Sequence, residues 1–299
     1  MTPILLTKPR LLKPISAAII KLDEINNNMP KETSFELHRE GLFVLAVSTV
    51  EVMLSDTLLE LFRKLPAKLP EKAYSVSKDL LLSRPFDLVE NLAQSYVLSL
   101  SYKKLDDILD IVNEHLATIK NFRDQHGDSL QEIKESRNLL LHNNLKLNAI
   151  YKEKAGKKSR HPMRGERLSI DPQYFLDSIT TLKELCIAMQ EGITEKYSEY
   201  TRIAAVQRLW NYIFQTPIMP FEKFWALNKA KDEIIAQETD SFPKGLSNSE
   251  KIFLGVWLSH FNSRKDHPDT EAFNLHRLDS RNQQKMLFLI SALRDFKLY

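Results

Sequence analysis

The chain has 299 residues, of which 43% are hydrophobic and 27% are charged, as in soluble globular proteins with room for two domains. The formal net charge of +3 permits a nucleic-acid partner but does not require one. Only 7 glycines occur, and the absence of G-x-G-x-x-G and G-x-x-x-x-G-K-[ST] motifs argues against dinucleotide and P-loop sites. The single cysteine, Cys186, excludes an intramolecular disulfide. Residues 1–22 show neither a continuous signal-peptide core nor a membrane span, so we expect a cytoplasmic protein.

Helical periodicity dominates the chain in sequence order. Residues 34–65 contain no proline and one glycine, which predicts one long buried helix or two nearly continuous ones. Residues 86–100 and 104–120 show apolar side chains at three- and four-residue spacing, as in amphipathic helices. No convincing alternating strand pattern appears, so the predicted fold class is all-α.

The next predicted helix contains "SRNLLLHNN" at residues 136–144, an unusual mixture of polar residues and leucines. Ser129-x-x-Glu132 after Gly127 has the form of a capping box, which predicts a helix from there to about Lys152. A basic loop follows, and Asp171-Pro172 then predicts an N-cap with proline in the first helical position.

The chain beyond residue 200 also reads as helical. Ser247-x-x-Glu250 and Asp279 are expected to cap two helices, and the three tryptophans are expected in a core or an interface. The predicted domains are a helical extension at residues 1–33, a helical domain at 34–204 and a C-terminal helical domain of unassigned role at 205–299.

Residues 136–144 place polar groups among leucines on one helix. On a helical wheel a polar stripe forms from Glu135, Asn138, His142 and Lys146. Arg137 lies about 140° around the helix from His142, by the 3.6-residue period. One straight helix therefore does not aim both side chains at one atom. Either the helix breaks near residues 143–144, or arginine and histidine from two copies meet across a symmetric interface. The alternative is a core histidine and a surface arginine in an ion pair.

The "RNLLLH" segment, within a stretch predicted to form four or five helices, resembles the signature of the HEPN superfamily. The similarity covers roughly residues 34–200, from the motif helix through a tyrosine-containing end and a variable loop into a last long helix. It implies a HEPN-like bundle of four to five helices that forms a homodimer through the motif helix.

The resemblance also implies metal-independent endoribonuclease chemistry, with no cofactor. In that chemistry the ribose 2′-OH attacks the adjacent phosphorus, leaving a 2′,3′-cyclic phosphate and a 5′-OH. His142 would act as general acid or base, and Arg137 would stabilise charge on the phosphorane. Asn138, one turn from His142, would orient its ring. The substrate would be tRNA or mRNA, the setting a toxin or antiphage defence, and a further partner an antitoxin or regulator.

One departure affects the regulation that the resemblance implies. Some family members carry a tyrosine two residues after the histidine, where a nucleotidyltransferase antitoxin modifies it. Asn144 stands there in this chain, and Tyr151 is too distant to substitute for it. That form of control is therefore in doubt.

Two other basic segments are candidates for a role in the site. The motif helix and the loop after it carry residues expected to track RNA phosphates, or to form only a solvated loop: Lys146, Lys152, Lys154, Lys157, Lys158, Arg160 and Arg164. "LHRE", with His38 and Arg39, could line the same cleft, but we expect a surface cluster at a helix start. The scattered histidines after residue 259 lack paired metal-ligand spacing, which argues against a zinc site.

Two further hypotheses remain open from the sequence. The first is a non-catalytic HEPN module that binds RNA or a partner protein. The second is a helical scaffold in which the six-residue match is a coincidence.

Overall fold

A computed structural model of the protein describes residues 3–30, 32, 35–74, 88–161, 167–215, 220–236, 245–261 and 278–297. The chain divides into two compact units. Residues 8–198 form the first, here called the N-terminal bundle, and residues 1–7 with 199–299 form the second, here called the C-terminal unit. Helices dominate both units, which confirms the all-α class.

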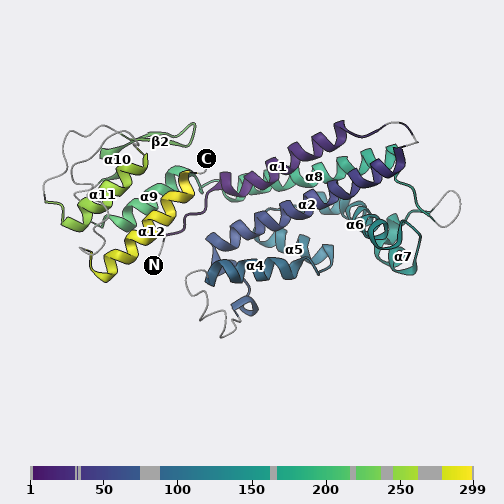
Figure 1. Ribbon diagram of the computed structural model, residues 1–299, viewed down its shortest axis with the longest axis horizontal. Coiled ribbons are helices and arrows are strands. Elements are labelled where there is room, and N and C mark those ends of the chain that lie inside the picture. Colours follow the sequence, from purple (N-terminus) through teal and green to yellow (C-terminus); the bar gives the residue numbers. More distant parts are fainter. Residues whose placement is uncertain are drawn as a thin grey trace. The chain divides into compact units, whose positions relative to one another are not determined.

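The N-terminal bundle is built around one central helix, α2, which contacts α1, α4, α6 and α8 (Figure 1). Its described elements, with η marking 3-10 turns, are α1 (Lys8–Asn27), α2 (Glu36–Lys64), η2 (Pro66–Lys68), η3 (Glu71–Tyr74), α4 (Leu88–Leu100), α5 (Leu105–His115), α6 (Lys120–Asn143), α7 (Ala149–Ala155), η5 (Gly156–Lys158) and α8 (Pro172–Lys196).

The long helix predicted at residues 34–65 is confirmed as the single helix α2. Among the described helices, α2 alone is long and apolar enough to cross a membrane by length and composition. It also buries Arg39 and Glu40, and its buried apolar side chains pack within the bundle. These features are typical of the core helix of a soluble protein.

The N-terminal 33 residues do not form a separate extension. Helix α1 packs along α2 and α8 and buries apolar residues at three- and four-residue spacing, so it is an integral helix of the bundle. Leu5 lies instead in the hydrophobic core of the C-terminal unit. The division between the units falls at Ser198 and Glu199, six residues before the predicted boundary at 204.

The C-terminal unit combines helices with a small hairpin that the periodicity did not reveal. Its described elements are α9 (Arg202–Ile213), α10 (Phe221–Phe224), β1 (Trp225–Asn228), β2 (Glu233–Ala236), α11 (Asn248–Phe261) and α12 (Ser280–Lys297). Strands β1 and β2 pair antiparallel, with Trp225 opposite Ala236 and Asn228 opposite Glu233. Each strand has only four residues, too few for an alternating pattern to stand out.

The C-terminal core confirms two expectations from the sequence. All three tryptophans are buried, and the Trp210 ring lies 5.1 Å from that of Trp257, centroid to centroid. The Ser247 hydroxyl donates to the Glu250 carboxylate at 2.7 Å and accepts from the Glu250 backbone N–H at 3.3 Å, a capping box. The Asp279 carboxylate likewise accepts from the Asn282 N–H at 2.8 Å, which caps α12.

Candidate functional site

The motif lies on helix α6, whose limits differ from those predicted at both ends. The helix begins at Lys120, so Ser129 is an interior residue and the capping-box prediction was wrong. The Glu132 carboxylate points into the bundle, where it serves a different purpose described below. The buried side chain of Phe122 anchors the earlier turns in the core. Tertiary packing therefore extended the helix past a local stop signal.

Helix α6 ends at Asn143, well before the predicted end near Lys152. Asn144 adopts the left-handed conformation with φ 48° and ψ 46°, which asparagine tolerates better than most residues. Its N–H donates to the carbonyl of Leu140, and the Asn143 amide donates to the carbonyl of Lys146 at 2.5 Å. The two adjacent asparagines thus have a structural explanation as a helix terminator.

Arg137 and His142 do not meet within one chain. The Arg137 side chain is 14% exposed and forms an ion pair with Glu51 of α2. Its Nε is buried and has no hydrogen-bond partner. His142 is exposed and forms no hydrogen bond or ion pair with any described residue. Since α6 continues through both positions, the predicted break does not bring the two side chains together.

Asn138 does not orient the His142 ring within this chain. Its amide donates to the carboxylate of Glu135 at 3.4 Å, and the Gln131 amide donates to the same side chain at 3.1 Å. The polar stripe expected on the helical wheel is therefore divided. Glu135 is buried with Asn138 beside it, whereas His142 lies in solvent beyond them.

Arg137 and Asn138 instead line a pocket of about 680 Å³ within the bundle, a volume suited to a small ligand. The apolar part of the lining comes from α2, α4, α5, α6 and α8. The charged lining residues are Lys103, Lys104, Lys134, Arg137, Lys154, Glu51, Asp106, Glu135 and Glu153. Burial lowers the pKa of Lys134, because desolvation disfavours its ammonium form, although Glu51 and Glu135 partly oppose the shift.

Residues 146–161 of the basic segment after α6 are folded, and their lysines differ in exposure from Arg160. Exposed lysines between α6 and α7, on α7 and in η5 are available to solvent and to a ligand: Lys146, Lys152, Lys154, Lys157 and Lys158. Arg160 points inward and pairs with Glu132, which argues against the predicted contact with RNA. Arg164, the last residue of the predicted set, lies outside the described residues.

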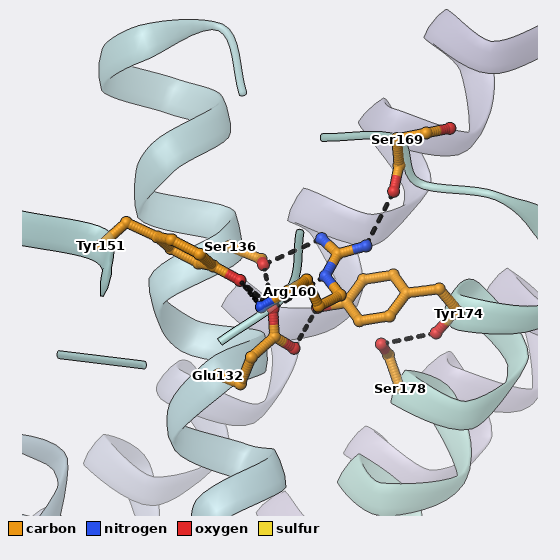
Figure 2. Close-up of polar contacts among 7 residues, drawn as sticks. All are labelled: Glu132, Ser136, Tyr151, Arg160, Ser169, Tyr174 and Ser178. Atoms are coloured by element: carbon orange, nitrogen blue, oxygen red, sulfur yellow. Dashed lines mark hydrogen bonds and ion pairs between the residues drawn. The ribbon is translucent and has the colours of Figure 1, made fainter. Parts of the chain in front are cut away.

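Arg160 belongs to a buried network centred on the carboxylate of Glu132 (Figure 2). Glu132 accepts from Tyr151 at 2.7 Å, from Tyr174 at 2.8 Å, from Ser136 at 2.5 Å and from Arg160 Nε at 2.9 Å. The Arg160 guanidinium also covers the Tyr174 ring at 3.4 Å. The network therefore joins α6, α7 and α8 and fixes the end of the basic segment to the motif helix.

The pKa values of the two tyrosines in this network are shifted because both phenols are buried beside one carboxylate. Burial, followed by the charge of Glu132, raises the pKa of Tyr174 well above its usual value and also raises that of Tyr151. Both phenols therefore stay protonated and donate to Glu132. Sequence reasoning missed this network, because its members lie far apart in the chain and Glu132 had a local explanation as a cap.

The "LHRE" segment is also structural rather than a surface cluster. Arg39 is 2% exposed and donates to the carbonyls of Ile170 at 3.0 Å and Glu32 at 2.6 Å. Glu40 is buried and pairs with Arg167 at 2.6 Å. His38 alone of the segment's polar residues is exposed.

No protein-family model matches the chain, and comparisons with curated proteins and with solved structures give no match. Within the described ranges, no group of three or more His, Cys, Asp or Glu side chains is arranged to hold a metal ion.

Proposed function

We propose that the protein is a metal-independent endoribonuclease with a HEPN-like active site, and that two copies complete this site. The observation that carries the proposal is the solvent-exposed His142, with no partner among the described residues, one residue before the end of α6. His142 is therefore not a buried structural histidine, which would be hydrogen-bonded within the fold. An exposed imidazole can instead exchange a proton with a substrate.

A second copy is needed because Arg137 faces the pocket and Glu51 while His142 faces solvent. Between them on α6, the Leu141 side chain is 53% exposed, and on the contacting helix α2 Val52 is 57% exposed. Exposed apolar side chains beside the motif suit a symmetric contact between two α6 helices. Such a contact would place the arginine and histidine of both copies around one cleft.

In the proposed reaction, the ribose 2′-OH attacks the adjacent phosphorus and the 5′ oxygen of the next nucleotide leaves. The products are a 2′,3′-cyclic phosphate and a 5′-OH. His142 transfers a proton at one of these oxygens, and Arg137 stabilises charge on the phosphorane. The exposed lysines of α7 and η5, on the segment following the motif, would attract the RNA backbone. We place the activity in the cytoplasm, as a toxin or defence effector acting on tRNA or mRNA.

A specific observation favours a second candidate, a non-catalytic module that binds RNA or a partner protein. Glu51 already neutralises the Arg137 guanidinium and holds it at the pocket wall. In the catalytic proposal, a substrate phosphate must displace this carboxylate. In the binding-module proposal, the ion pair is simply part of the fold.

The deciding experiment incubates wild type, His142→Ala and Arg137→Ala with tRNA and total RNA in EDTA, followed by mapping of product ends. We expect wild type to leave cyclic phosphates, and each variant to lose at least about 100-fold in rate. His38→Ala is the matched control for the histidine, since His38 is also exposed on a helix of the bundle. Arg123→Ala is the control for the arginine, since Arg123 lies on α6 and pairs with Asp106 and Asp110.

Equal cleavage by wild type and both motif variants would refute the catalytic proposal. Absence of cleavage, together with RNA affinity that the motif variants reduce, would support the binding module instead. Sedimentation of wild type and Leu141→Asp tests the second copy, because a buried charge at the contact should shift the protein to monomer and abolish cleavage together.

A further inference from the structure

The C-terminal unit contains a pocket of about 490 Å³ that is independent of the motif helix. Part of its lining is a face of α9 with Gln207, Arg208 and Asn211, which share a side of the helix by their spacing. Pro220, Phe221 and Glu222 also line the pocket. The α9 face is therefore rich in hydrogen-bond donors.

The guanidinium of Arg208 is incompletely satisfied within the fold. Its Nε and Nη2 atoms are both buried and have no hydrogen-bond partner. Its Cζ lies 5.6 Å from the centroid of the Tyr200 ring, a contact that orients the group without using its donors. Buried charged donors are costly when unpaired, so a fold that retains two of them on one arginine calls for an explanation.

The two free donors have a specific geometry. Nε–H and an Nη2–H lie along one edge of the guanidinium plane, the edge that binds both oxygens of a carboxylate or phosphate at once. Glu222 lines the same pocket but is exposed, and no ion pair joins it to Arg208. No described residue therefore pairs with this edge of the guanidinium.

We propose that this pocket binds a small ligand through one oxyanion group, a carboxylate or a phosphate, held by the Nε and Nη2 edge of Arg208. The side-chain amides of Gln207 and Asn211 donate hydrogen bonds to the same ligand. Among the described side chains that line the pocket, Arg208 is cationic and Glu222 is anionic, so the pocket favours a singly charged group over a polyanion such as an RNA strand. This site gives the C-terminal unit a sensing role that does not depend on the proposed nuclease.

The test is isothermal titration of the full chain with inorganic phosphate and, separately, with acetate, in a buffer free of both. We expect saturable binding of one equivalent of at least one anion, and the stronger one identifies the ligand chemistry. Arg208→Lys keeps the charge but loses the paired donors, so affinity should fall at least tenfold. Arg281→Lys, an exposed arginine of α12 in the same unit, should bind as wild type does.

A second measurement guards against a folding defect in the variant. The Nε–H resonance that disappears in Arg208→Lys should shift in the wild-type ¹H–¹⁵N spectrum when the bound anion is added. Failure of both anions to bind, an unmoved Arg208 resonance at saturation, or equal affinity in Arg208→Lys would each overturn the proposal.

Discussion

Removal of the Glu132 carboxylate should destabilise the N-terminal bundle more than a change at any surface ion pair. The side chain is 5% exposed, and that of Arg160 is 21% exposed, so little water is available to replace their contact. Glu132→Ala leaves Arg160 as a buried charge without its carboxylate and leaves Tyr151 and Tyr174 without their acceptor. Breaking one partner of a buried ion pair costs about 3–5 kcal/mol, so we expect a loss of unfolding free energy in that range.

The energies of the hydrogen bonds to Glu132 are consistent with a loss of this size in unfolding free energy. Each hydrogen bond to a charged group contributes about 1.5–3 kcal/mol, and the four that Glu132 accepts share two oxygens, so they do not add in full. Glu132→Gln retains one acceptor oxygen and the side-chain shape, and should lie between wild type and Glu132→Ala. The assay is urea unfolding followed by circular dichroism at 222 nm.

The surface comparison is Glu24→Ala, which removes the carboxylate that Lys21 contacts at 3.0 Å in an exposed pair on α1, and this change should cost about 1 kcal/mol or less. A double-mutant cycle with Arg160→Met should give a coupling energy with Glu132 of at least about 1 kcal/mol. A loss below about 1 kcal/mol in Glu132→Ala, or a coupling energy near zero, would refute the view that this carboxylate organises the bundle.

Three other predictions concern the N-terminal bundle. Gly192→Ala would place a Cβ 2.8 Å from that of Ala117 and should lower the free energy of unfolding in urea by about 1–3 kcal/mol. Gly41 has open space around it, so Gly41→Ala should raise that free energy by up to about 1 kcal/mol by stabilising α2. Burial raises the pKa of the Cys186 thiol to about 12, so native protein at pH 8 should not react with Ellman's reagent within minutes. Unfolding in urea should expose one reactive thiol. Rapid reaction of the native protein would contradict this burial. The pKa of Lys134 is lowered by burial, so the unfolded state binds more protons between the folded pKa and 10.5, and this residue makes stability rise with pH there. Lys134→Met should reduce that rise in unfolding titrations, and an unchanged slope would show that Lys134 is not buried in solution.

Local signals in the sequence predicted much of the helical framework. The long helix α2 follows from uninterrupted apolar periodicity. The start of α8 follows from Asp171, whose carboxylate accepts from the Tyr174 N–H at 2.9 Å as predicted. The same kind of reasoning failed at Ser129, where the capping pattern lies inside α6 because Phe122 packs in the core.

The sequence predicted less of the candidate site than of the fold. Arg137, Asn138 and His142 could be selected by residue type and spacing, and the wheel predicted that Arg137 and His142 diverge. Their partners could not be identified in this way. Glu51 lies far from Arg137 in the sequence, and only the packing of α2 against α6 brings the two side chains together.

The sequence by itself determined which segments are helical and where several of them begin, because the backbone and capping hydrogen bonds of a helix join residues within four positions of one another. Only the tertiary structure decided which charged side chains are internal. Arg39 donates to the carbonyl of Ile170 across 131 residues, and Arg160 pairs with Glu132 across 28. Both arginines resemble surface residues in the sequence. Their burial is possible only because packed helices bring distant acceptors to them, and desolvating a guanidinium is tolerated only where such acceptors are in place.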